Sequence, residues 1–147
     1  MAKIERFEDI EARQSARKLR QSVYRLTRAK PFAADPSLVD QIRRAAVSGT
    51  SNTAEGFARG GNRELIQFLS LAKGSVAEVK DQLYCALDEN YVSREQFEDF
   101  RIAESTSRLI GGFMSYLRNS EISGHKFATP SARLNSKPKT QTPKPPL

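Results

Sequence analysis

Arginine side chains are the residues of this sequence best suited to chemistry. Seven basic residues and no acidic residue occur between positions 12 and 34. Within this segment an arginine or a tyrosine recurs at spacings of three or four, at Arg13, Arg17, Arg20, Tyr24 and Arg28. On a helix these spacings place the five side chains in one stripe. Guanidinium groups bind phosphate with a planar set of donors, and arginine and tyrosine both stack on bases, so the stripe predicts a nucleic-acid contact.

Four further arginines extend this basic surface to the next helix, at Arg43, Arg44, Arg59 and Arg63. Two acidic residues, Asp35 and Asp40, lie near the start of that helix and would oppose a phosphate there. The alternative is that the arginines form ordinary surface ion pairs with acidic neighbours, namely Glu8, Glu11, Glu64 or Glu104. The sequence leaves both interpretations open.

Enzymatic and metal-dependent functions lack the residue types that they need. The single cysteine and the single histidine, Cys85 and His125, cannot supply a structural zinc site, and no base lies near Cys85 in the sequence. We interpret Cys85 as a packing residue. The glycines at positions 56, 60 and 61 are not followed by the Lys-Ser or Lys-Thr pair of a phosphate-binding loop. We therefore expect no enzyme activity, no cofactor and no metal.

The net charge of +7 is unevenly distributed along the 147 residues. Residues 119–147 contain five basic residues and one acidic residue, whereas the first 118 contain 19 basic and 16 acidic residues. Five of the seven prolines also fall after position 118, so we expect a disordered, basic tail there. The sequence has no apolar run typical of a signal peptide or a membrane span, and one cysteine allows no internal disulfide. We therefore expect a cytoplasmic protein.

Amphipathic helices would position the arginines, because apolar residues recur every three or four positions through most of the first 118 residues. We expect four helices, over about 9–28, 36–59, 62–87 and 94–118. Asp35, Asn62 and Ser93 are the predicted N-caps, and Gln96 completes a capping box with Ser93. Short connections between such helices predict an all-α fold, an antiparallel up-down four-helix bundle in residues 1–118, with the tail in residues 119–147.

The second helix has an unusual inner face of small and polar residues. Six residues share this face: Ile42, Ala45, Ala46, Gly49, Thr53 and Gly56. Small side chains allow another helix to approach closely, and neighbouring polar groups then need hydrogen-bond partners. We therefore interpret Ser48, Asn52, Glu55 and Gly56 as a structural motif that fixes helix register. A close helix contact would also explain Gly74, in the middle of the third helix.

Three segments resemble a known protein family. The run Arg43-Arg44-Ala45-Ala46-x-Ser48-x-x-x-Asn52-x-Ala54-Glu55-Gly56 is similar to the signature of the four-helix-bundle proteins encoded by intervening sequences inside bacterial 23S ribosomal RNA genes. Two other segments resemble the first and third helices of that family: Phe7-Glu8-Asp9-Ile10 with Ala16, and Phe68-Leu69-x-x-Ala72-x-Gly74-Ser75-x-x-Glu78. The resemblance covers about residues 4–118.

The resemblance implies a fold, and it makes the motif on the second helix diagnostic of that fold without assigning an activity. Relatives of the family in diversity-generating retroelements accompany a reverse transcriptase, and they form five-fold barrels of bundles with a basic surface. For this chain the resemblance thus implies a homo-oligomer, possible binding of RNA or DNA, and a reverse-transcriptase-like partner. A pentamer is the subunit number that it suggests.

Two non-enzymatic functions follow from these observations. The arginine surface favours a nucleic-acid-binding accessory protein. The fourth helix favours a protein-binding scaffold, because a second apolar row widens its apolar face beyond one bundle seam. That row consists of Ile102, Thr106, Leu109, Phe113 and Tyr116. A wide apolar face suits a subunit contact, although a deeply buried helix would have the same pattern.

Overall fold

The computed structural model describes residues 4–120 and is all-α, as predicted. Four long helices make up most of this part of the chain: α1 (Glu11–Arg28), α2 (Pro36–Arg59), α3 (Asn62–Asp88) and α5 (Ile102–Asn119). Four short segments complete it: the 3₁₀ turns η1 (Phe7–Asp9), η2 (Phe32–Ala34) and η3 (Asp99–Arg101), and the helix α4 (Arg94–Glu98). No strand occurs among residues 4–120. Nearly all of the predicted tail lies outside the described residues.

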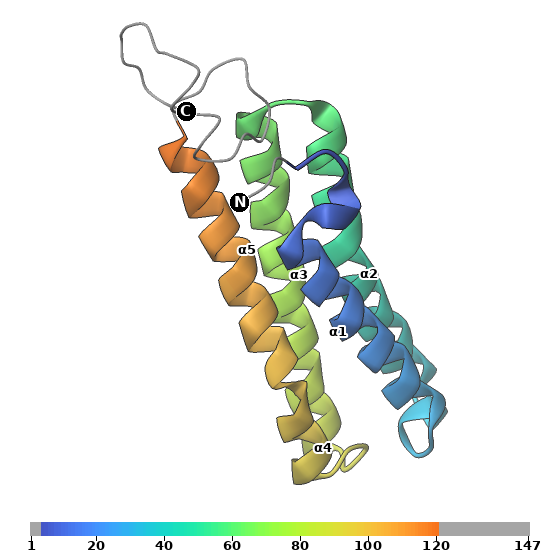
Figure 1. Ribbon diagram of the computed structural model, residues 1–147. Helices are drawn as coiled ribbons and strands as arrows, with labels where there is room; N and C mark the ends of the chain where they lie inside the picture. Colours follow the sequence, from blue (N-terminus) through green and yellow to red (C-terminus); the bar gives the residue numbers. More distant parts are fainter. Residues whose placement is uncertain (1–3, 121–147) are drawn as a thin grey trace, which may run out of the picture.

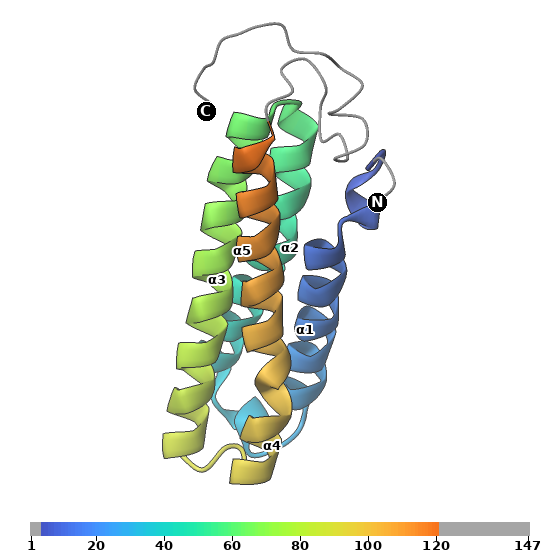
Figure 2. The same cartoon turned by 60° about the vertical axis from the view of Figure 1, so that its left-hand side comes forward.

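The long helices lie side by side along a common direction (Figures 1 and 2). The main contacts join α2 to α3, α3 to α5, and α1 to both α2 and α5, so each long helix has two principal neighbours. One apolar core runs between them. Its fully buried side chains come from every long helix: Leu19, Val23, Ile42, Leu65, Leu69, Val79, Leu83, Ile110 and Leu117. Along α3 the buried residues recur with helical spacing: Leu65, Leu69, Ala72, Ser75, Val76, Val79, Leu83 and Ala86.

The helix boundaries follow mostly from local sequence signals. Asp35 caps α2 by accepting a hydrogen bond from the Leu38 N–H at 3.1 Å, and Pro36 is the first helical residue. Gly60 ends α2 in the left-handed region, at φ 96°, which glycine adopts without strain. Ser93 and Gln96 form the predicted capping box at the start of α4. These signals fix where the chain turns between helices.

Two predicted helix features are wrong. Asn62 makes no capping bond, because Gly61 takes the extended N-cap position and Asn62 becomes the first helical residue. The predicted helix over 94–118 is interrupted, since Phe100 has non-helical backbone angles between α4 and α5. Phe97 and Phe100 both pack partly buried against the core from this stretch. The local change to 3₁₀ geometry accompanies that packing, which helical periodicity does not reveal.

Replacing Asp35 with Ala is expected to lower the free energy of unfolding by about 1–2 kcal/mol. The substitution removes the α2 cap, which is worth about 1 kcal/mol. It also removes the acceptor of a 2.9 Å hydrogen bond from the Tyr91 hydroxyl, whose net worth is about 1 kcal/mol. Tyr91→Phe, which removes the second bond alone, should cost about half as much in urea unfolding. A Tyr91→Phe loss equal to that of Asp35→Ala would contradict this division.

Candidate nucleic-acid interface

The predicted arginine stripe of α1 lies beside the buried line of that helix and along its seam with α2. Ala12, Ala16, Leu19 and Val23 turn into the core, and the stripe occupies the adjoining positions. Arg17 and Arg28 are exposed, whereas Arg13, Arg20 and Tyr24 are half-buried. Contacts of Arg20 with Thr50 and of Tyr24 with Arg43 place the stripe against α2. The structure therefore brings Arg20, Tyr24 and Arg43 together at one seam between the two helices.

Arg20 is held at the seam by an uncharged partner. Its Nη1 donates a hydrogen bond to Thr50 Oγ1 of α2 at 2.8 Å. The Thr50 hydroxyl is buried and itself donates to the Val47 carbonyl at 2.9 Å, so the acceptor is fixed. The guanidinium is thus oriented while its charge has no carboxylate partner within residues 4–120.

Arg43 reaches back from α2 to α1 in a similar way. Its Nε donates to Thr27 Oγ1 at 2.8 Å, and Thr27, which is buried, donates in turn to the Val23 carbonyl. The Cζ atom of Arg43 lies 4.5 Å from the centroid of the Tyr24 ring, a cation–π distance. Arg43 and Tyr24 therefore hold one another in place across the seam.

Arg13 lies at the other end of the stripe, with its Cζ 5.1 Å from the centroid of the Phe7 ring. Its Nε is buried and has no hydrogen-bond partner among residues 4–120. Burial is the main cause that lowers the pKa of Arg13, and the positive charges of Arg20 and Arg17 lower it further, against a smaller opposing effect of Glu8. Two like charges thus act on Arg13, and an anion placed there would relieve their repulsion.

Two of the nine candidate side chains are neutralised by acids one helical turn away. Arg44 pairs with Asp40 at 2.8 Å, which raises the pKa of Arg44, and Arg59 pairs with Glu55 at 2.9 Å. These two arginines therefore form surface ion pairs, as the alternative interpretation predicted. Their partners are acidic residues other than the four named from the sequence. Of the acids considered, Glu104 pairs with Lys80 instead. Arg63, on the first turn of α3, is exposed.

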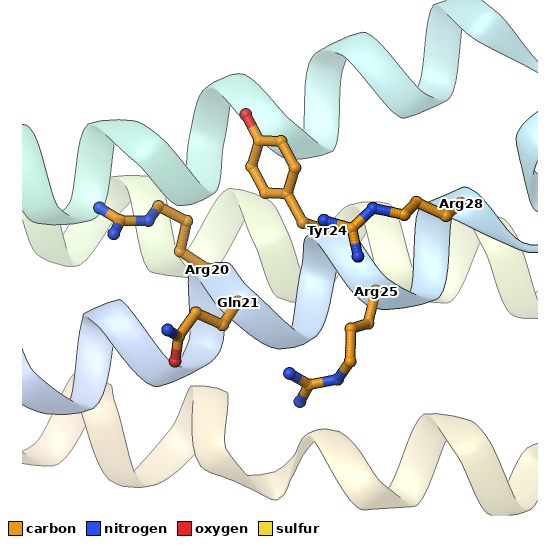
Figure 3. A pocket seen from close by; sticks show the side chains of 5 residues that line it. All are labelled: Arg20, Gln21, Tyr24, Arg25 and Arg28. Carbon is orange, nitrogen blue, oxygen red and sulfur yellow. The ribbon is translucent and has the colours of Figure 1, made fainter.

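Arg20 and Arg28 border a shallow hollow of about 400 Å³ on the surface of α1. Its lining contains no acidic residue: Arg20, Gln21, Tyr24, Arg25 and Arg28. Figure 3 shows the Tyr24 ring directed toward α2, with Arg20 and Arg28 on either side along the helix, and Gln21 and Arg25 directed away from α2. A second hollow adjoins through Arg28 and includes Arg43 and Asp40. Arg25 escaped sequence reasoning because it lies off the stripe, although it belongs to the same acid-free segment.

The motif on α2 joins that helix to α3. Ser48 Oγ accepts hydrogen bonds from Asn52 Nδ2 and from Ser75 Oγ of α3, both at 2.8 Å. Gly56 is buried against Phe68 and Leu65 of α3, where a Cβ atom added to it would lie 2.7 Å from Phe68 Cβ. This geometry fits the structural interpretation of Ser48, Asn52 and Gly56. Glu55 differs, because it is exposed and pairs with Arg59 on the outer surface.

Sequence comparison is decisive for the family. A family model described as 23S rRNA-intervening sequence protein matches residues 8–112. The chain belongs to this family. A search of curated proteins finds no match. The matched span includes the whole arginine stripe and the α2 motif, so both are features of a 23S rRNA-intervening sequence protein.

Two interpretations of individual residues are wrong for this family member. Cys85 is exposed, because the buried positions at this end of α3 are Leu83 and Ala86 and Cys85 falls between them. Gly74 is also exposed, and a Cβ atom added there would meet nothing within 4 Å. A close helix contact therefore does not explain Gly74.

Metal and membrane features do not compete with the hollow in the part of the chain that the structure describes. No group of three or more His, Cys, Asp or Glu side chains within residues 4–120 is placed to hold a metal ion. In the same residues, no helix is both long enough and apolar enough to cross a membrane. The hollow on α1 and the arginines around it form the candidate site.

Proposed function

We propose that this family member is a non-enzymatic accessory protein, an antiparallel up-down four-helix bundle that binds RNA or DNA through the arginines of the α1/α2 seam. One observation carries the proposal. Arg13, Arg20 and Arg43 are positioned by aromatic rings or hydroxyl groups, and none of them forms an ion pair with a carboxylate of residues 4–120. Short connections between the long helices support the antiparallel arrangement.

Arginines held by uncharged groups are suited to bind phosphate for two reasons. An arginine that is already oriented loses less conformational freedom when it binds, so more of the interaction appears as affinity. An arginine without a carboxylate also need not break an ion pair before it meets a phosphate. Contacts of this kind fix the position of a nucleic-acid backbone without reading its sequence. We therefore propose sequence-independent binding.

Assembly and partners form the second part of the proposal. We infer a cytoplasmic homo-oligomer. The resemblance to accessory proteins of diversity-generating retroelements, noted from the sequence, suggests five subunits. A reverse-transcriptase-like protein is the corresponding partner. Several copies of the seam around one axis would multiply the phosphate contacts and raise the overall avidity.

The test measures how nucleic-acid affinity depends on salt. The full-length protein should bind RNA and DNA oligonucleotides with an affinity that falls steeply as salt rises, because each neutralised phosphate releases counterions. Replacing Arg13, Arg17 and Arg20 with Ala should reduce the slope of log K against log salt by about 2 on single strands, or about 0.7 for each lost contact. Fluorescence anisotropy over a range of salt concentrations provides the measurement.

A matched control removes two arginines together with their acids. Replacing Asp40, Arg44, Glu55 and Arg59 with Ala leaves the net charge unchanged, so the slope should also stay unchanged. The proposal is wrong if the native protein binds neither nucleic acid at low salt. It is also wrong if the triple substitution leaves the slope as it was.

A protein-binding scaffold is the second candidate function. Leu71 on α3 is 57% exposed, and Val47 on the neighbouring α2 is also exposed, so apolar side chains are available outside the core. The second apolar row of α5 is mostly half-buried and packs against the core. A scaffold would be an oligomer by light scattering and would bind its partner with little dependence on salt.

A further inference from the structure

We propose that the hollow on α1 takes one unpaired base of a single-stranded nucleic acid, stacked on Tyr24, with backbone phosphates at Arg20 and Arg28. This inference rests on the proposed nucleic-acid function and specifies its ligand. The supporting observations are the fixed position of the ring, the charge of the hollow and the disposition of its arginines.

The Tyr24 ring is a preformed platform. Arg43 lies over it at 4.5 Å from α2, and Arg43 is itself held by the buried Thr27 hydroxyl at 2.8 Å. Arg43 therefore packs on the ring from the α2 side, and its own hydrogen bond holds it in that position. Tyr24 is nevertheless only half-buried and still lines the hollow. An aromatic ring that is both fixed and accessible is what base stacking requires.

The charged side chains around this platform are all positive. Arg20 and Arg28 border Tyr24 on either side along α1 (Figure 3), and Arg25 and the neutral Gln21 complete the lining. The partners of Arg20 and Arg25 are hydroxyl groups, Thr50 Oγ1 and Ser22 Oγ, so neither charge is compensated by them. Arg20 and Arg28 are eight residues apart, which is about 12 Å along the helix. Two cations therefore flank the Tyr24 ring, where their long side chains can contact the backbone of a strand whose base stacks on the ring.

A single strand fits this arrangement better than a duplex. A duplex presents its phosphates to a protein, but its bases are stacked on one another and their faces are not available. Against a duplex the arginines would bind while Tyr24 would contribute nothing. A single strand can use both, because a cationic groove combined with an aromatic ring is the usual means of binding unpaired bases. The position of Tyr24 between the arginines thus favours a single strand.

The first experiment separates stacking from charge. Tyr24→Leu should weaken binding of the full-length protein to a 12-nucleotide oligo(dT) or oligo(U) about tenfold, the loss expected for one stacked base, without changing the salt slope. Tyr24→Phe keeps the ring and should bind as the native protein does. A 12-nucleotide abasic strand should bind the native protein as weakly as oligo(dT) binds Tyr24→Leu. Native affinity for a 12-base-pair duplex should be unaffected by Tyr24→Leu.

A second experiment places a reporter in the hollow. The chain contains no tryptophan, so Tyr24→Trp introduces a single tryptophan, which can be excited at longer wavelength than the tyrosines. Addition of oligo(dT) should quench its emission, because a stacked base quenches an indole. Tyr84→Trp, at an exposed position on α3, is the matched control and should not be quenched. This readout stays informative even if Tyr24→Leu reduces the stability of the bundle.

The outcomes distinguish the two proposals. Salt-sensitive binding with no effect of Tyr24→Leu and no quenching at Tyr24→Trp would overturn the stacking site and leave the proposed function intact. Equal affinity for the abasic strand and oligo(dT) would overturn it in the same way. Failure of the native protein to bind any of these oligonucleotides would overturn both proposals together.

Discussion

Replacing Leu69 with Ala is expected to lower the free energy of unfolding by about 2–5 kcal/mol. Leu69 is fully buried on α3, where it packs in the core shared by the long helices. The substitution removes apolar contacts and leaves a cavity, and a close-packed interior fills such a cavity only in part. Urea unfolding followed by circular dichroism measures the loss as a lower midpoint with an unchanged slope.

Leu71 is the matched control for this prediction, because it is the same residue type on the same helix. It is 57% exposed, so Leu71→Ala should change the free energy of unfolding by no more than about 0.5 kcal/mol. Equal losses at positions 69 and 71 would contradict the exposed position of Leu71. They would indicate that another molecule covers it in solution.

The four long helices could be predicted because the core is regular. Ala12, Ala16, Leu19 and Val23 recur with helical spacing in the sequence, and all four are buried. A helix that buries one face must carry such a stripe, whatever its neighbours are. The order of the helices and the all-α class follow directly from these stripes and from the turn residues between them.

Features that depend on neighbouring elements could not be predicted in this way. Periodicity alone does not show that the chain departs from helical geometry at Phe100. Periodicity also does not show that Gly74 faces solvent, because a glycine has no side chain from which a buried or exposed helix face could be inferred. The error at Cys85 has a related cause. Its apolar neighbours in sequence suggested burial, but adjacent residues on a helix point in directions about 100° apart.

The sequence predicted which residues form the candidate site, but it did not predict which partner each arginine contacts. The sequence placed Arg20 and Arg44 in one basic surface, whereas the structure gives Arg20 a hydroxyl partner and Arg44 a carboxylate. Which partner an arginine meets depends on how two helices are rotated against each other. Spacing within one helix predicts only pairs of residues that lie four positions apart. That rule would have identified the Asp40–Arg44 and Glu55–Arg59 pairs.

The packing of the core depends little on Arg20 and Arg43 at the seam. Binding can therefore be tested without a large change in stability. Thr50 and Thr27 accept hydrogen bonds from Arg20 and Arg43, but each hydroxyl also donates to a carbonyl of its own helix. Removing the arginine therefore leaves the buried hydroxyl with a partner, and little desolvation cost follows. Substitutions at the seam should change binding without unfolding the bundle.

The tight contact of Gly56 with α3 should be sensitive to added volume. Replacing Gly56 with Ala is expected to cost about 2 kcal/mol net. The new Cβ atom would lie 2.7 Å from Phe68 Cβ and 3.3 Å from Leu65 Cα, so the two helices would have to separate. Such overpacking costs up to about 3 kcal/mol, against which the better helix propensity of alanine returns about 1 kcal/mol.

Gly74→Ala is the control, and it should change the free energy of unfolding in the opposite direction. This glycine also lies within a long helix, but a Cβ atom there meets nothing within 4 Å. Only the propensity term acts, and the substitution should stabilise the protein by up to about 1 kcal/mol. Thermal and urea unfolding of the two variants should therefore move in opposite directions from the native protein. A stabilised Gly56→Ala would show that α2 and α3 are not in close contact at this glycine, and the structural role of the α2 motif would be lost with it.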